Sequence, residues 1–166
     1  MLAARTTSAD QTRALAVALG PVVAPGDLVL LTGDLAAGKT TFAQGLGRSL
    51  GVAEAITSPT FTLHRRYRGR VEFNHLDVYR IDQLEEVADL GLPELLDGDG
   101  VTLIEWGDVV APVVPADYLE VRISLGEGDD DRRFELEPVG PRWKARVRSL
   151  GEVLGPWREG GGDEAC

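Results

Sequence analysis

Residues 33–41 combine glycines, a lysine and threonines at the spacing that binds the phosphate groups of a nucleotide. The segment runs Gly33, Asp34, Leu35, Ala36, Ala37, Gly38, Lys39, Thr40, Thr41. Glycines let backbone amides approach phosphate oxygens, and the helix that follows points its positive dipole end at the anion. The Lys39 ammonium is expected to neutralise phosphate charge, and the Thr40 hydroxyl to bind Mg²⁺. Because the segment matches the G-x-x-x-x-G-K-[ST] pattern in full, it predicts nucleotide binding.

Two carboxylates are candidates for the acid that orders the water shell of the metal. Glu105 directly follows the apolar run 101–104, and strand ends are where ligands bind in open α/β sheets. Asp77 lies two residues after His75, so a strand would place both side chains on one face. The sequence leaves open which acid lies nearer to the metal. For His75 we favour a packed, hydrogen-bonded strand residue over a proton carrier.

Hydrophobic spacing and capping patterns predict the elements that position these residues. The predicted helices span 8–19, 39–50, 83–88 and 143–150, and the predicted strands span 28–31, 60–67, 70–78, 101–104, 118–125 and 132–137. Ser8 and Gln11 form a capping box for the first helix, and Gly51 supplies a left-handed cap for the second. Gly45 and Gly47 weaken the second helix, and close packing against a strand or another subunit would explain them.

Length and composition fit one folded domain. The chain has 166 residues, of which 43% are hydrophobic and 27% charged, and this predicts a single domain over 1–155 with a flexible tail over 156–166. The one cysteine, Cys166, excludes an intramolecular disulfide and a cysteine-based metal site. The first ten residues lack the pattern of a signal peptide, and no apolar run reaches about 18 residues. We therefore expect a cytoplasmic protein that does not contact a membrane.

Charge is distributed unevenly along the chain. The formal net charge is −10, and residues 82–131 hold fifteen acidic residues and one basic residue. This balance argues against direct binding of nucleic acid, so any RNA role is expected to need a partner. Four arginines in 65–70 form either a solvated hairpin or a partner-docking surface, and both interpretations stay open. Four basic residues in 141–148 either complement RNA phosphates or match a helix dipole, and we favour the dipole.

Four sequence blocks together resemble the TsaE (YjeE) family, the small ATPases of the bacterial machinery that makes threonylcarbamoyladenosine in tRNA. The blocks are residues 33–41, 58–62, 75–80 and 103–106, and the resemblance extends over about residues 8–137. It implies a P-loop NTPase-like fold of three layers, α/β/α, with a mixed central sheet, and binding of ATP and Mg²⁺. It also implies a complex with the TsaD and TsaB proteins, in which the ATPase resets the catalytic pair and meets tRNA only indirectly.

The resemblance also assigns residues to roles. Carried over by position, the phosphate contacts fall on Gly38, Lys39, Thr40 and Thr41, the metal contacts on Thr40 and Glu105, and catalysis on Lys39, Asp77 and Glu105. Ser8 and Arg132 match the family positions that contact the base or ribose. Trp106 matches a tryptophan beside the acidic strand end, where it is either core or an anchor for a partner. The hydroxyls of Ser58, Thr60 and Thr62 are either γ-phosphate sensors or a plain strand entry.

The chain departs from the family at Ala36, where members usually carry glycine. An alanine in a left-handed conformation costs about 1 kcal/mol, so we expect an ordinary backbone conformation at this position.

Two other functions remain alternatives to an ATPase at this stage. A P-loop small-molecule kinase would use the same loop but would need an acceptor pocket and an arginine lid, for which the sequence offers only 65–70. A nucleotide-gated binding module would bind ATP without turnover, and its acids would be structural.

Overall fold

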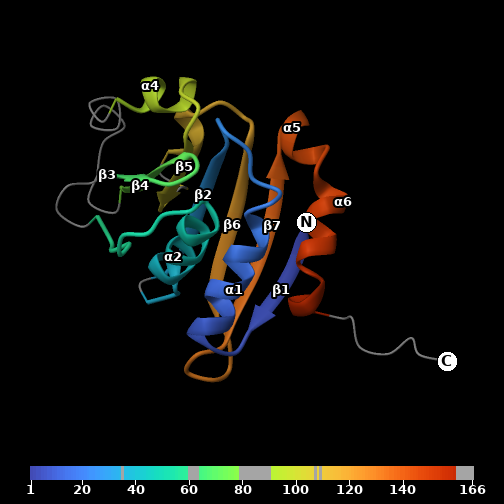
Figure 1. The fold of residues 1–166 in the computed structure, drawn as a ribbon. Helices are drawn as coiled ribbons and strands as arrows, with labels where there is room; N and C mark the ends of the chain where they lie inside the picture. Colours follow the sequence, from blue (N-terminus) through green and yellow to red (C-terminus); the bar gives the residue numbers. More distant parts are fainter. Residues whose placement is uncertain (35, 60–63, 79–90, 107, 109, 160–166) are drawn as a thin grey trace.

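A single seven-stranded sheet forms the centre of the molecule (Figure 1). The computed structural model describes residues 1–34, 36–59, 64–78, 91–106, 108 and 110–159. The strands are β1 (Leu2–Thr6), β2 (Leu28–Gly33), β3 (His64–Arg68), β4 (Glu72–Asp77), β5 (Val101–Glu105), β6 (Tyr118–Leu125) and β7 (Arg132–Val139), in the order β1-β7-β6-β2-β5-β4-β3. Strands β6, β2, β5 and β4 are parallel neighbours. At the sides, β7 is antiparallel to β6, β3 is antiparallel to β4, and β1 is antiparallel to β7. The predicted α/β class with a mixed sheet is confirmed.

Helices lie on both faces of this sheet. They are α1 (Ala9–Leu19), α2 (Lys39–Ser49), α4 (Leu92–Asp97), α5 (Pro141–Lys144) and α6 (Val147–Val153), with short 3₁₀ turns η1 (Ala111–Val113) and η2 (Gly155–Trp157). The larger core joins α1, α2, α5 and α6 to one face of the sheet, and α1 and α2 lie side by side in Figure 1. The smaller core joins α4 and the start of η1 to the opposite face, over β2, β4 and β5.

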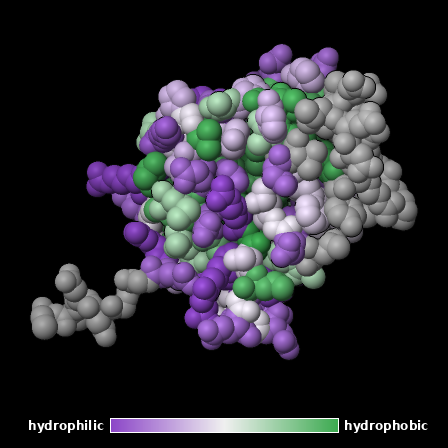
Figure 2. Space-filling model, turned by 180° about the vertical axis from the view of Figure 1, so that it is seen from behind, coloured by the Kyte–Doolittle hydropathy of each residue, from purple (hydrophilic) through white to green (hydrophobic). Residues whose placement is uncertain are grey.

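The smaller core covers only part of its face of the sheet, and the rest of that face is exposed to solvent. On β6 and β7, that face carries charged side chains, and Arg122 pairs there with Glu120 and Glu135. Figure 2 shows the molecule from behind, where hydrophilic side chains surround separate hydrophobic patches. Of these two pairs, Arg122–Glu120 lies within β6, and Arg122–Glu135 joins register partners on β6 and β7. Charged side chains of this kind need no covering helix. Within the described residues, no helix combines the length and apolar character needed to cross a membrane.

Several elements of the structure differ from the predicted ones. Strand β1 was not predicted, because its sequence LAART buries only Ala4 and Thr6 and so shows no apolar alternation. The last predicted helix is two helices, α5 and α6, with a break at residues 145–146. Helix α4 was not predicted either, and the predicted helix at 83–88 lies outside the described residues, as does the start of the strand at 60–67.

Part of the expected tail packs against the domain. Residues Gly155–Trp157 form a 3₁₀ turn, Arg158 makes a β-bridge with Ala4, and Glu159 pairs with Arg133. Residues 160–166 lie outside the described part of the chain.

The basic residues of the C-terminal helices bind a buried acid. The carboxylate of Asp27 is 1% exposed and accepts hydrogen bonds from Arg146, from Arg142 at 3.3 Å and from the Ala24 amide at 2.7 Å. The Arg146 guanidinium also lies over the Trp143 ring. Neither expectation for 141–148 includes this contact, in which Arg142 and Arg146 neutralise an acid 115 or more positions earlier in the chain. Arg142 and Lys144 also lie in the last turn of α5, as the dipole interpretation expects.

Helices α1 and α2 touch closely at Gly45, where α1 leaves no room for a Cβ atom. A Cβ atom on Gly45 would lie 2.8 Å from Ala16 Cβ and even closer to the Arg13 carbonyl oxygen. The predicted close packing is therefore present at Gly45, but its partner is a helix rather than a strand. At Gly47 the neighbours are Ile56 and, on β4, Phe73.

Two glycine substitutions form a matched test of this packing. Alanine raises helix propensity by about 1 kcal/mol at either position. Gly151, in α6, has only the Arg158 guanidinium within 4.0 Å of its missing Cβ, so Gly151→Ala should raise the free energy of unfolding by about 0.5–1 kcal/mol. Gly45→Ala should instead lower it by about 1–3 kcal/mol through overpacking. Urea denaturation measures both, and equal gains would show that α1 moves aside without cost.

Candidate functional site

The phosphate loop connects the end of β2 to the start of α2. Gly33 has φ 151°, and a Cβ there would lie 2.5 Å from the Ile123 carbonyl oxygen, so only glycine fits. Gly38 is the N-cap of α2 with φ 100°, and it offers no side-chain hydrogen bond to the helix. The first amides of a helix have no intrahelical acceptors. The loop therefore presents free backbone donors and a helix dipole at one point, as anion binding requires.

The backbone at Ala36 is left-handed, with φ 63°. The expectation of an ordinary conformation at this position was wrong. The loop reverses direction within four residues, since the Ala37 amide donates to the Asp34 carbonyl at 3.1 Å. Within this turn Ala36 adopts a conformation that its Cβ disfavours. Leu35, also predicted to contact the nucleotide, lies outside the described residues.

The Lys39 ammonium lies at the centre of the loop. Its Nζ donates to the carbonyl oxygens of Gly33 at 2.7 Å and Asp34 at 2.8 Å, and it lies 4.1 Å from the centre of the Trp106 ring. Burial lowers the pKa of Lys39, whereas the nearby carboxylates of Glu105 and Asp77 act in the opposite direction. Trp106 has φ 63°, so a second left-handed residue lies beside this lysine.

The two candidate acids lie next to each other at the carboxyl ends of β4 and β5. Asp77 and Glu105 are register partners, and both side chains are buried. Glu105 Oε1 lies 3.5 Å from the Thr40 hydroxyl, and Asp77 Oδ2 accepts from the Ser58 hydroxyl at 3.3 Å. Of the two acids, Glu105 is thus the one that contacts Thr40. Thr60 and Thr62, considered with Ser58 as phosphate sensors, lie outside the described residues.

His75 holds the second oxygen of Glu105. Its Nε2 lies 2.7 Å from Glu105 Oε2, and the imidazole is fully buried and stacked on Phe73. This confirms the interpretation of His75 as a packed, hydrogen-bonded strand residue. The contact fixes the orientation of the carboxylate, because one oxygen is bonded to the ring while the other faces Thr40. The two residues are 30 positions apart, so no local pattern in the sequence indicates the pair.

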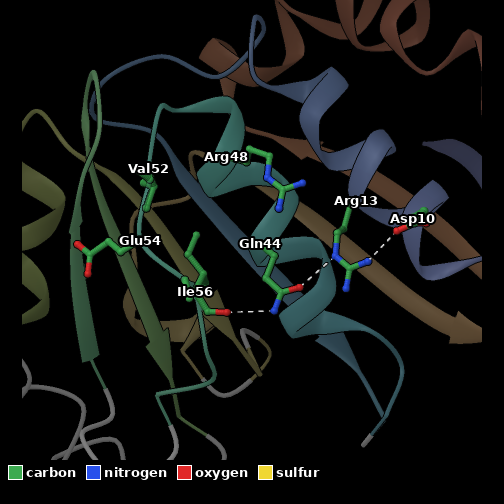
Figure 3. A pocket seen from close by; sticks show the side chains of 9 residues that line it. Asp10, Arg13, Gln44, Arg48, Val52, Glu54 and Ile56 are labelled. Atoms are coloured by element: carbon green, nitrogen blue, oxygen red, sulfur yellow. Dashed lines mark hydrogen bonds and ion pairs between the residues drawn. The ribbon is translucent and has the colours of Figure 1, made fainter.

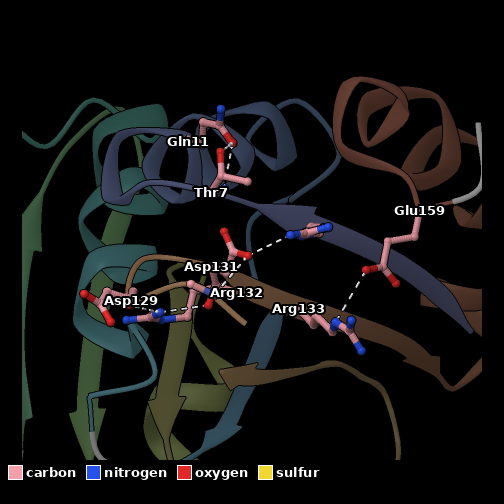
Figure 4. A network of polar contacts seen from close by, with 9 residues as sticks. Thr7, Gln11, Asp129, Asp131, Arg132, Arg133 and Glu159 are labelled. Atoms are coloured by element: carbon pink, nitrogen blue, oxygen red, sulfur yellow. Dashed lines mark hydrogen bonds and ion pairs between the residues drawn. The ribbon is translucent and has the colours of Figure 1, made fainter. Parts of the chain in front are cut away.

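Ser8 and Arg132, expected near the base or ribose, lie in different local settings. The Ser8 hydroxyl caps α1 by accepting from the Gln11 amide at 3.1 Å. Arg132, at the start of β7, donates to the carbonyl oxygens of Ala36 and Ala37 in the phosphate loop. Figure 4 shows Arg132 among the polar contacts that follow the β6–β7 loop. A small cavity of about 30 Å³ lies between the starts of α1 and α2, and it is lined by Ala9, Thr12, Gly38, Thr41, Asp130 and Arg132.

A separate hollow of about 460 Å³ lies between α1, α2 and residues 52–56 (Figure 3). It shares no lining residue with the phosphate loop. Gln44 connects its walls, because its side chain accepts from Arg13 Nε at 3.1 Å and donates to the Ile56 carbonyl at 3.0 Å. The first contact joins α1 to α2, and the second joins α2 to residues 52–56.

The donor set at the loop fits a hard cation that needs few protein ligands. The oxygens of Thr40 and Glu105 are a hydroxyl and a carboxylate, the ligand types that Mg²⁺ takes, and Mg²⁺ usually keeps several waters. Across the described ranges, no group of three His, Cys, Asp or Glu side chains forms a metal cluster. A cation here would therefore depend on these two residues and on phosphate oxygens. The arrangement is suited to binding a nucleoside triphosphate and to stabilising charge on its terminal phosphate.

The sequence is similar to a described family over most of its length. The family model for "Threonylcarbamoyl adenosine biosynthesis protein TsaE" matches residues 6–134. A protein of Bacillus subtilis named tRNA threonylcarbamoyladenosine biosynthesis protein TsaE is 39% identical over 147 residues, which cover 88% of this chain and 91% of that protein. A protein of the same name from Treponema pallidum is 48% identical over 118 residues, covering 71% of this chain and 86% of that protein.

The fold is also similar to a solved structure. The crystal structure of YdiB from Bacillus subtilis superimposes with a TM-score of 0.78 at 34% sequence identity. The match covers 91% of this chain and 94% of that chain.

The lowered pKa of Lys39 can be measured directly, because the chain contains only two lysines, Lys39 and Lys144. In protein labelled with ¹³C at lysine Cε, the Lys39 resonance should titrate below the ordinary value of 10.5. A Lys144→Arg variant assigns the signals. Added Mg-ADP should raise the midpoint, since phosphate stabilises the charged ammonium. A midpoint at or above 10.5 without nucleotide would contradict the burial of this group.

Proposed function

The chain belongs to the TsaE family of threonylcarbamoyl adenosine biosynthesis proteins, and we propose that it acts in that pathway as a Mg²⁺-dependent ATPase. The observation that carries the proposal is the convergence of Lys39, Thr40 and Glu105 at the phosphate loop. In this proposal, ATP hydrolysis resets the partner proteins that install threonylcarbamoyl on tRNA adenosine. The chain itself does not modify tRNA.

Lys39 is the group that would contact the phosphate oxygens. Its ammonium now bonds to two neutral carbonyl oxygens, and charged phosphate oxygens are stronger acceptors for the same donor. A phosphate therefore draws Lys39 away from the carbonyls of Gly33 and Asp34. The amides at the start of α2 would bind the same phosphates from the other side.

Thr40 and Glu105 would hold Mg²⁺, whose charge would neutralise the transferring phosphoryl group. His75 keeps Glu105 in the orientation that faces Thr40. Asp77 lies beside Glu105 in the sheet and would orient the attacking water or the metal's water shell. The carboxylate of Asp77 is itself held by the Ser58 hydroxyl.

We propose that the isolated protein hydrolyses ATP slowly and that partners accelerate the reaction. Fast phosphoryl transfer in P-loop enzymes commonly uses an arginine that contacts the phosphates in the transition state. Arg132 is close to the loop, but its Nε, Nη1 and Nη2 groups already donate to backbone carbonyls. The arginine, or the ordering of the site, would then come from a partner.

The proposed partners are the TsaD and TsaB proteins of the tRNA-modifying complex. The net charge of −10 supports contact with protein rather than direct contact with tRNA. Because the substrate of this complex is tRNA, we place the protein in the cytoplasm.

Substitutions should separate binding from hydrolysis. Lys39→Ala should weaken Mg-ADP binding at least tenfold in calorimetry, because it removes the cation from the loop. Glu105→Gln and Asp77→Asn should keep affinity within about threefold but lower kcat by about 100-fold in a phosphate-release assay. Glu135→Gln, on the exposed strand face, is the matched carboxylate control and should behave as wild type. Wild-type turnover in both buried-acid variants would remove them from the mechanism.

Labelled ATP distinguishes the ATPase from a kinase. With γ-labelled ATP, the isolated chain should release phosphate slowly, and added TsaD and TsaB proteins should raise the rate at least tenfold. Turnover of tens per second by the isolated chain would contradict this dependence. Transfer of label to a small-molecule acceptor, with no phosphate release, would favour the kinase. Co-purification with and without ATP identifies the partners that the nucleotide recruits.

A further inference from the structure

We propose that Arg132 is a positioning residue of the phosphate loop, which holds the left-handed peptide at Ala36 in its binding conformation. The inference rests on the proposed nucleotide binding by this loop. It gives Arg132 a task different from the base or ribose contact that the family resemblance implies.

The Arg132 guanidinium connects two loops that are distant in sequence. Its Nε donates to the Ala37 carbonyl at 3.0 Å, and its Nη2 donates to the Ala36 carbonyl at 3.2 Å. On its other side, Nη1 donates to the carbonyls of Asp129 at 2.9 Å and Asp131 at 2.8 Å. A planar fork with fixed donor directions can bind several carbonyls at once, which an ammonium on a flexible stem cannot do as well.

The positions of the carbonyls determine where the amides point. In a trans peptide the N–H and C=O groups point in opposite directions. Arg132 binds the carbonyls of Ala36 and Ala37, so it also fixes the directions of the Ala37 and Gly38 amides. Gly38 is the N-cap of α2, where the loop would receive a phosphate. The guanidinium thus orients these amides by binding the carbonyl oxygens on the opposite side of each peptide, and it would not itself contact the phosphate.

The loop needs this support because Ala36 has a Cβ. A left-handed conformation is disfavoured for alanine by roughly tenfold in population, whereas glycine adopts it freely. Arg132 donates two charge-assisted hydrogen bonds, to the carbonyl oxygens of Ala36 and Ala37. These bonds hold Ala36 at its φ of 63°. A glycine at position 36 would not depend on them to the same extent.

Arg132 is itself held by the β6–β7 loop. The neighbouring Asp131 carboxylate accepts from Arg5 of β1 at 2.7 Å and from the Gly128 amide at 3.2 Å (Figure 4). Arg5 thereby lowers the pKa of Asp131. Strand β1, the loop and Arg132 form one continuous set of contacts that ends on the phosphate loop.

A double-mutant cycle separates positioning from direct ligand contact. Four proteins are compared by calorimetry with Mg-ADP: wild type, Arg132→Gln, Ala36→Gly and the double variant. We expect Arg132→Gln to weaken binding about tenfold when residue 36 is alanine and less than threefold when it is glycine. Arg132→Lys keeps the charge but loses the fork, so it should behave like Arg132→Gln. Arg133→Gln is the matched control, because Arg133 pairs with Glu159 instead, and it should leave affinity unchanged.

Equal losses in the alanine and glycine backgrounds would overturn the proposal and favour a direct contact between Arg132 and the nucleotide. Full affinity in Arg132→Lys would also overturn it, since charge alone would then suffice. The same cycle is measured without nucleotide, by urea unfolding. A smaller effect of Arg132→Gln on unfolding in the glycine background supports the proposal, and additive effects contradict it. If wild type binds no nucleotide, the proposed function fails, while the unfolding cycle still decides the role of Arg132.

Discussion

The backbone amides at the start of α2 impose the constraint on which the site depends. These donors have no acceptor within the helix, and the N-cap Gly38 has no side chain to satisfy them. An anion would complete their hydrogen bonding, and the buried Lys39 ammonium adds charge at the same point. The parallel centre of the sheet, with β2 between β5 and β6, places this helix start at its carboxyl edge, where β4 and β5 also end.

Two opposing effects act on the charge of the Lys39 ammonium. Burial of Lys39 disfavours its charged form, and the carboxylates of Glu105 and Asp77 offset part of that cost. His75 takes one oxygen of Glu105 and leaves the other beside Thr40. The same arrangement of side chains would provide oxygen ligands for a cation beside the loop.

Long-range polar contacts act beside the hydrophobic cores at two places. Asp27 receives the guanidinium of Arg146 and so joins the C-terminal helices to the start of β2. Arg132 joins the β6–β7 loop to the phosphate loop. Each of these guanidinium groups binds two or more oxygen acceptors through N–H groups in fixed directions. Arginine suits this role better than lysine, and the chain uses arginine far more often.

The sequence by itself determined the phosphate loop and the elements on each side of it. Their signals are local: a glycine and lysine pattern, a capping box at Ser8, and apolar runs that end on Glu105. Tertiary structure alone decided the partner of His75, the role of Arg132 and the existence of β1. Each depends on residues far apart in the chain, so no short pattern encodes it. Tertiary structure also decided the conformation of Ala36, because a turn closed by neighbouring contacts overcame the local preference of alanine.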